Sequence, residues 1–179
     1  MITVEEVKAA RKIEHSEEDA LLETLIKSAL QYIERRTGQI FVKREQEEMV
    51  LDQLPTGSNG VELQWTPVRA VQSVNYLNVS GVSEALGAGD VYLDSRGVYP
   101  VLYPLNGAQW PESKCARGSV TVVADIGYSE LPHDIRLAAL LLIGHFYENR
   151  EAVVIGVTAE SVPHGFEMLI ADYIIERVG

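Results

Sequence analysis

The sequence predicts an α+β protein, a small antiparallel bundle of about four helices with an inserted antiparallel β unit. Apolar residues recur at helical spacing near both ends of the chain, whereas short β-branched runs separated by proline- and glycine-rich turns fill the middle. With 179 residues, 46% of them hydrophobic, the chain can bury a core. We expect three segments: an N-terminal helical hairpin over 1–38, the β unit over 39–128 and C-terminal helices completing the bundle over 129–179.

The N-terminal hairpin is predicted from its start and stop signals. Thr3 precedes a glutamate by three residues, the pattern of a capping box, which predicts a first helix from Thr3 to about Ile13. Ser16, followed by Asp19, predicts the start of a second helix, because acids in a first turn suit the helix dipole. Gly38 follows a basic turn and predicts where that helix ends.

The middle of the chain reads as strands and turns. The last strand is the clearest, because its apolar residues alternate with more polar neighbours, as in a half-buried strand. A stretch from 104 to 117 predicts an irregular loop, and turns are expected at 55–60, 78–81 and 87–90. The predicted strands are 48–51, 61–64, 71–77, 91–93, 98–103 and 119–127.

Helical spacing returns near Pro132, which fits the first turn of a helix. Apolar residues then occupy nearly every face, including Leu137, Leu140 and Leu141, so we expect a helix that is buried on almost all sides. A last helix follows a link over 152–162. The apolar residues expected on one face of that helix are Phe166, Leu169, Ile170, Tyr173 and Ile174.

The net charge of the chain indicates which partners it can bind. A net charge of −11 repels phosphate backbones, so we expect no specific binding of DNA or RNA. The same charge suits a wall along which DNA slides, although acidity can also serve solubility alone. No apolar stretch is long enough to span a membrane and no secretory leader is visible, so we expect a protein of the bacterial cytoplasm.

Catalytic motifs are missing from the sequence, which indicates neither an enzyme nor a cofactor-binding protein. Gly87 and Gly89 are better explained by a turn than by a phosphate loop. His145 and Glu148 lie three residues apart and could share a metal, but a satisfied buried histidine or an inter-helix hydrogen bond is the more frequent arrangement. Cys115 lies beside two basic residues, without a paired histidine that would make it a nucleophile.

Acidic and aromatic residues in the β unit have two interpretations each. Asp90, Asp94 and Asp125 could form a carboxylate cluster only through the tertiary fold, and acids on loops are usually solvated. The aromatic residues fit the core of a small sheet more often than an interface. They are Trp65, Tyr76, Tyr92, Tyr99, Tyr103, Trp110 and Tyr128.

The order of the segments, together with several short motifs, resembles the phage head–tail connector (head-completion adaptor) family in its longer form with an inserted β unit. The motifs run along nearly the whole chain, and the series from Gly127 to Glu151 is the specific one. They are 32–38 (YIERRTG), 51–55 (LDQLP), 65–68 (WTPV), 71–76 (VQSVNY), 110–111 (WP), 125–128 (DIGY), 131–132 (LP) and 145–151 (HFYENRE).

This resemblance implies a structural subunit of the virion head–tail junction, made in the host cytoplasm. It implies a ring, with a dodecamer expected from the portal, that binds the portal protein and a stopper or tail-completion protein while DNA passes through its channel. No catalytic residue, metal or cofactor is implied.

Physical reasoning suggests which residues could join subunits of such a ring, because head-to-tail contacts close a cyclic assembly when the rotation fits. The polar helix ends are one candidate, and the apolar part of the link, which could become ordered on a partner, is another. These candidates are Arg35, Arg36, Glu148, Arg150, Glu151, Val153, Val154 and Ile155.

Two alternatives remain open from the sequence. One is an α+β interaction module unrelated to phage assembly, with the same helices but another partner. The other is a small metal-dependent enzyme that uses His145 and Glu148 with an acid from the sheet.

Overall fold

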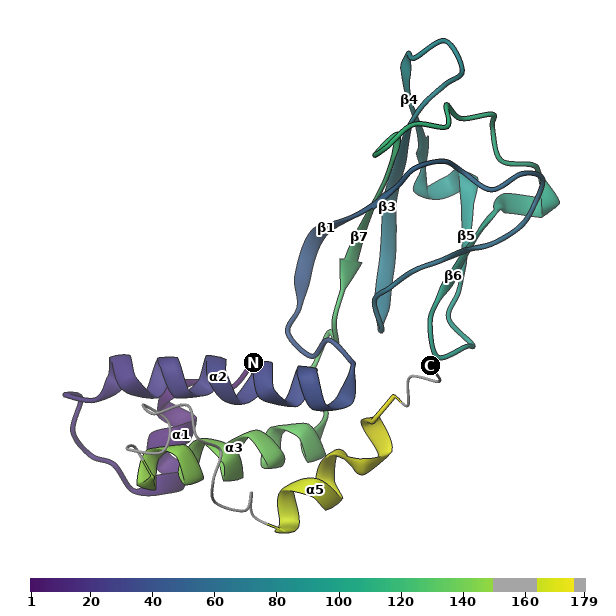
Figure 1. Ribbon diagram of the computed structural model, residues 1–179. Helices are drawn as coiled ribbons and strands as arrows, with labels where there is room; N and C mark the ends of the chain where they lie inside the picture. Colours follow the sequence, from purple (N-terminus) through teal and green to yellow (C-terminus); the bar gives the residue numbers. More distant parts are fainter. Residues whose placement is uncertain (150–163, 176–179) are drawn as a thin grey trace. The chain divides into compact units, whose positions relative to one another are not determined.

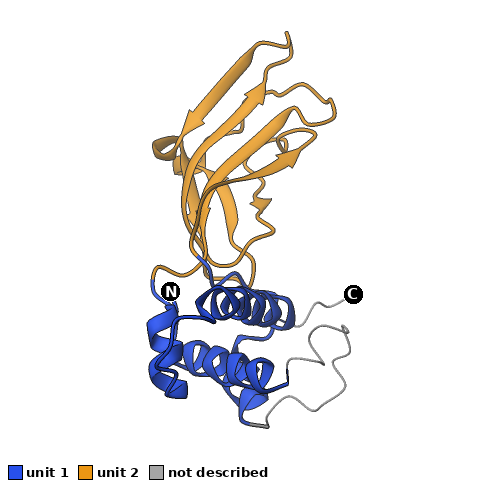
Figure 2. Cartoon of the chain, turned by 90° about the vertical axis from the view of Figure 1, so that its left-hand side faces the viewer, with its two compact units in different colours: residues 1–42, 130–179 blue, residues 43–129 orange. Residues whose placement is uncertain are grey.

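The computed structural model describes residues 1–149 and 164–175, and the chain divides into two compact units (Figure 2). Unit 1 comprises residues 1–42 and 130–179, and unit 2 comprises residues 43–129. The described part of unit 1 is helical, and unit 2 contains the strands of the described chain, paired in antiparallel sheets. The predicted α+β class is therefore confirmed. No helix in the described ranges combines the length and the apolarity needed to cross a membrane.

Unit 1 is built around one central helix, α3, which contacts the other three (Figure 1). Its buried face carries residues that are completely shielded from solvent, among them Ile135, Leu142 and Ile143. The helices are α1 (Val4–Arg11), α2 (Asp19–Thr37), α3 (His133–Glu148) and α5 (His164–Ile170), followed by a 3₁₀ turn, η3 (Ala171–Tyr173).

The helix boundaries confirm some of the predicted signals and correct one. The Thr3 hydroxyl accepts a hydrogen bond from the Glu6 amide at 3.2 Å, as a capping residue does, and α1 follows it. Gly38 ends α2 with a positive φ of 76°, as predicted. The predicted start at Ser16 is wrong, because α2 begins at Asp19 without a side-chain cap.

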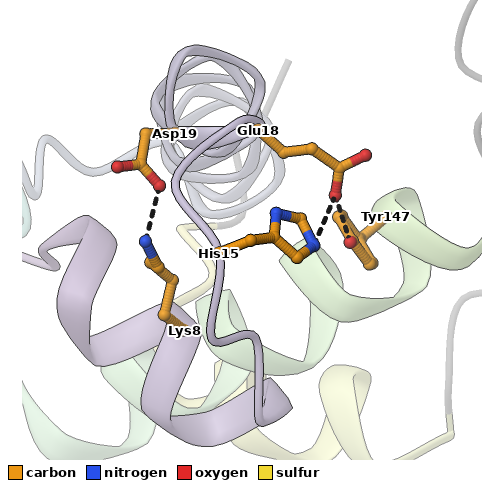
Figure 3. Close-up of polar contacts among 5 residues, drawn as sticks. All are labelled: Lys8, His15, Glu18, Asp19 and Tyr147. Atoms are coloured by element: carbon orange, nitrogen blue, oxygen red, sulfur yellow. Dashed lines mark hydrogen bonds and ion pairs between the residues drawn. The ribbon is translucent and has the colours of Figure 1, made fainter.

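The turn before α2 is held by side chains from other helices instead (Figure 3). The Glu18 carboxylate faces His15, 3.9 Å away, and accepts a hydrogen bond from the hydroxyl of Tyr147 on α3. Lys8 on α1 pairs with Asp19 at 2.8 Å. Glu18 thus acts through tertiary contacts where a serine cap was expected, and no local spacing in the sequence indicates them.

The prediction that α3 is buried on nearly every side is wrong for one face. Leu137 is 50% exposed, and Leu140 and Leu141 are only half-buried. α1 covers part of the helix through Arg11, whose guanidinium lies where a side chain at Gly144 would be, 0.9 Å from the position of a Cβ. The packed helices therefore leave the strip around Leu137 open in the described part of the unit.

The last helix is shorter than predicted. α5 buries Phe166 and Ile170 as expected, but it tightens into η3 and Ile174 follows in extended backbone. Residues at the end of α2 hydrogen-bond to this segment. The Gln39 side chain donates to the Tyr173 carbonyl at 2.8 Å, and the Ile175 amide donates to the Thr37 carbonyl at 2.7 Å. These long-range bonds replace the next helical turn.

Unit 2 contains two antiparallel sheets, in the orders β1-β7-β3-β4 and β2-β6-β5. The six predicted strands are all present with shifted ends, and β4 was not predicted. The bounds are β1 (Arg44–Leu51), β2 (Val61–Glu62), β3 (Val68–Leu77), β4 (Ser83–Gly87), β5 (Val91–Asp94), β6 (Val101–Pro104) and β7 (Val120–Ile126), with 3₁₀ turns η1 (Ala88–Asp90) and η2 (Leu105–Gly107).

The core of unit 2 lies on one face of each sheet. Along β7 every second residue, from Val120 to Ile126, is completely buried, which confirms the alternation read from the sequence. Leu102 on β6 and Trp110 in the loop after η2 are also buried, and the Trp110 indole donates to the Asn59 carbonyl at 2.7 Å. The alternate residues of β7 and β6, such as Val123 and Tyr103, are half-buried.

We expect Gly60→Ala to destabilise unit 2. A Cβ at this position would lie 2.3 Å from Val101 Cγ1 and 2.8 Å from the Tyr103 ring, so these side chains of β6 would have to move. Such overpacking costs about 1–3 kcal/mol in free energy of unfolding, measured by denaturant titration. Gly89→Ala is the matched control, because a Cβ there meets nothing within 4 Å. Equal stabilities of the two variants would contradict this account.

Candidate assembly surfaces

The two arginines predicted for subunit contacts lie at the end of α2, but they are not equivalent. Arg36 binds both carboxylate oxygens of Glu167 on α5, at 3.1 and 3.2 Å, and so fastens α5 to α2. Arg35 is exposed, and within the described ranges no hydrogen bond or ion pair engages its side chain. Both arginines are exposed, and Arg35 is the one of the two that no described residue pairs with.

Glu148, the acidic candidate at the end of α3, is exposed but already paired. Its carboxylate accepts a hydrogen bond from Arg11 on α1 at 3.0 Å. An exposed pair of this kind contributes little to stability and can be exchanged for a partner at small cost. The remaining candidates, Arg150, Glu151, Val153, Val154 and Ile155, lie outside the described residues.

The structure separates the two residues of the metal-site hypothesis. His145 Nδ1 faces the Asn149 amide at 3.3 Å, whereas the Glu148 carboxylate is directed to Arg11. Among the described residues no group of three or more His, Cys, Asp or Glu side chains could hold a metal ion.

The three acids of the β unit do not form a cluster, because each serves its own turn or strand. Asp90 accepts from the Gly87 amide at 2.8 Å, and Asp125 accepts from the Gln46 amide at 3.1 Å. Asp94 binds the side chain of Arg96 at 2.6 and 2.9 Å, and this partner lowers the pKa of Asp94 to about 2. All three are fixed structural acceptors.

The hairpin formed by β3 and β4 was not predicted, because the short, glycine-ended β4 has little strand character. The turn of this hairpin presents Val79 and Val82, which are 64% and 57% exposed. Asn78 orders the turn: its Oδ1 accepts from the amides of Ser80 and Val82, both at 3.0 Å. The predicted turn at 78–81 is confirmed, and the apolar Val79 and Val82, within and beside this turn, were the signal for the surface that the sequence offered.

The base of the hairpin is fixed by one carboxylate. Glu84 accepts from the Tyr76 hydroxyl and from the Asn78 side-chain amide, both at 2.6 Å. These bonds lower the pKa of Glu84, and the bond to Glu84, together with burial, raises the pKa of Tyr76 to about 12. The tip is therefore a rigid turn held by a charged, hydrogen-bonded acid.

A hollow of about 520 Å³ lies on the second sheet, where β5, β6 and η2 meet. Its apolar lining comes from Tyr92, Tyr103, Pro104 and Leu105, and Arg96 lies at the same site. Tyr92 is half exposed, so the preference for a core role of the aromatic residues is wrong for Tyr92, whereas Tyr76 and Trp110 are buried as that preference implied.

Most of the polar groups described above bond within the chain itself. The hairpin tip with Val79 and Val82 and the hollow beside Tyr92 remain exposed. A family model described as "Head completion protein" matches residues 1–163, and the chain belongs to this family. The connector family that the motifs indicated is thereby confirmed. The protein has a structural role as a head–tail connector at the junction of head and tail.

Solved structures with the same fold come from phage-like particles. The neck of an empty gene transfer agent (GTA) particle, computed with C6 symmetry, includes a chain with TM-score 0.77 and 24% identity, covering 99% of this chain and 91% of that one. A chain of the virion of a native GTA particle has TM-score 0.71 and 25% identity, with coverages of 92% and 81%.

The neck of a native GTA particle, computed with C12 symmetry, includes a chain with TM-score 0.71 and 23% identity, covering 99% of this chain and 93% of that one. None of the curated proteins compared with the chain is significantly similar to it.

We expect Tyr76→Phe to change how stability depends on pH. The folded pKa of Tyr76 lies above its ordinary value of 10.0, so the contribution of this hydroxyl is complete below pH 10 and is lost as the pH rises toward about 12. The difference in free energy of unfolding between wild type and Tyr76→Phe should shrink across that range. Glu84→Gln is the control, because it removes the acceptor charge; a constant difference for Tyr76→Phe would contradict this assignment.

Proposed function

We propose that the chain forms a closed ring beneath the portal of a phage-like particle, lengthens the DNA channel and docks the stopper or tail-completion protein. The observation that carries the proposal is the match of residues 1–163 to the head completion family. The C12 symmetry of one structure with this fold supports twelve copies, the number expected of a ring seated on a portal.

The charge of the chain supports a channel rather than a DNA-binding protein. Each subunit carries a net charge of −11, so a ring would repel the phosphates of DNA passing through it. Each Lys–phosphate contact adds a salt-dependent attraction, and a wall poor in free cations avoids such contacts. The proposed ring therefore binds DNA neither tightly nor in a sequence-specific way.

We also propose that the protein has no catalytic activity. The supporting observation is that the acids and the histidine considered as catalytic candidates each bond to another group of the chain; they are Asp90, Asp94, Asp125, Glu148 and His145.

The division into segments 1–38, 39–128 and 129–179 remains a prediction about domains, and so does the contribution of the link residues to portal binding.

We expect Arg35→Glu to weaken assembly on the portal without changing stability. Arg35 is exposed at the end of α2, so reversing its charge removes a contact available to a neighbouring subunit or to the portal. The measurement is co-sedimentation of the full chain with the portal protein of the same particle, with rings counted in electron micrographs. We expect about a tenfold or greater loss of bound subunits, equivalent to at least about 1.4 kcal/mol.

Lys27→Glu is the matched control, because Lys27 is an exposed cation in the middle of the same helix. It changes the net charge equally and should leave assembly intact. If both variants assemble like wild type, the end of α2 is not a contact. If wild type itself does not join the portal, the proposed function fails.

A further inference from the structure

The hairpin tip of unit 2 is apolar, and so is part of the lining of the hollow, which lies elsewhere on the same unit. The tip presents two exposed valines, Val79 and Val82, and residues 77–83 contain no charged side chain. The hollow of about 520 Å³ is open and lined on its apolar side by Tyr92, Tyr103 and Leu105. β4, which follows the tip, and β6, which lines the hollow, are separate in Figure 1.

Charge favours a second copy of this chain as the occupant of the hollow. Two copies at −11 each repel one another, so a contact between them is favoured where the facing residues are uncharged or of opposite charge. The tip satisfies this condition. At the hollow, Asp94 is neutralised by Arg96, whose side chain is 84% exposed.

The groups beside the two surfaces are also complementary. Arg96 uses two of its five N–H donors on Asp94, which leaves three for an incoming acceptor within the described structure. Glu84, at the base of the tip, is an exposed carboxylate whose pKa is lowered, so it carries its negative charge at neutral pH. A tip that enters the hollow brings an acid toward a cation with free donors.

The tip is ordered before it binds. The Asn78 side chain accepts from two amides of the turn, and its backbone amide donates to the Val82 carbonyl at 2.9 Å. Glu84 holds the base of the turn through two further bonds. Since little conformational entropy is lost on contact, burial of two valines gives a larger net gain than it would for a flexible loop.

We propose that the β3–β4 tip of one subunit inserts Val79 and Val82 into the Tyr92–Tyr103–Leu105 hollow of the next subunit. The contact joins two different surfaces, so its repetition in one direction produces a head-to-tail association, which closes into a ring when the rotation between subunits fits. This inference rests on the proposed ring and names the contact that unit 2 contributes to it.

Disulfide trapping in the full chain tests the contact. The native thiol at Cys115 is exposed, so it is first removed by Cys115→Ser. Val82→Cys and Leu105→Cys are then made separately in that background, one is labelled with ¹⁵N, and an equimolar mixture is oxidised. Mass spectrometry distinguishes the mixed dimer from the two homodimers.

The ratio of mixed dimer to the two homodimers should exceed the ratio for random pairing by about tenfold, because a specific contact raises the local concentration of the two thiols. Val50→Cys mixed with Leu105→Cys is the matched control, since Val50 is an exposed valine of the same sheet (58% exposed, against 57% for Val82). A mixed dimer at the control level overturns the inference.

A second variant separates this inference from the proposed function. Val82→Asp places a charge on the tip and should prevent the subunits from forming a complete ring on the portal protein. If Val82→Asp subunits form rings like wild type, the tip contact is overturned and the connector role stands. If wild type does not join the portal, the proposed function fails, while the trapping result still decides whether the tip meets the hollow.

Discussion

Burial of one face of α3 against three other helices is the interaction on which unit 1 depends. α1 and α2 precede the β unit in the chain, whereas α3 and α5 follow it, so this core forms only when distant segments meet. Completely buried residues such as Ile135 and Leu142 supply the apolar area, and peripheral pairs such as Arg136–Glu6, at 2.8 Å, fix how α1 lies on α3. The helical unit is thus one cooperative body built from both ends of the sequence.

In an acidic chain that assembles, the charged groups that keep it soluble and the apolar groups that make contacts must lie at different places. The negative charge of this protein is carried by acids that are solvated or bonded within the chain, and the exposed valines of the hairpin tip lie in a turn that side-chain hydrogen bonds order. Glu84 shows how one residue serves both needs. It remains charged, which favours solubility, and it fixes the turn that carries Val79 and Val82.

The sequence predicted the features that local chemistry decides. Thr3 and Gly38 sit at helix ends whose geometry only a few residue types satisfy, and the alternation in β7 reports directly which side chains face the core. The errors arose where tertiary contacts decide the outcome. Ser16 has the right local pattern, but Glu18 finds partners on another helix; Leu137 is apolar, but no described helix covers it. Spacing along the chain reveals neither the partners of Glu18 nor the exposure of Leu137.

The candidate surfaces were harder to predict for the same physical reason. Arg35 and Arg36 are neighbours with equal charge, yet only Arg36 lies within reach of Glu167, 131 positions away in the sequence. The hairpin tip gave little signal because β4 is stabilised by pairing with β3 rather than by its own strand propensity. The groups with which a connector can bind its neighbours are those that remain exposed and unpaired after folding. That set is a property of the packed chain, so its members become visible only when the long-range partners of their neighbours are known.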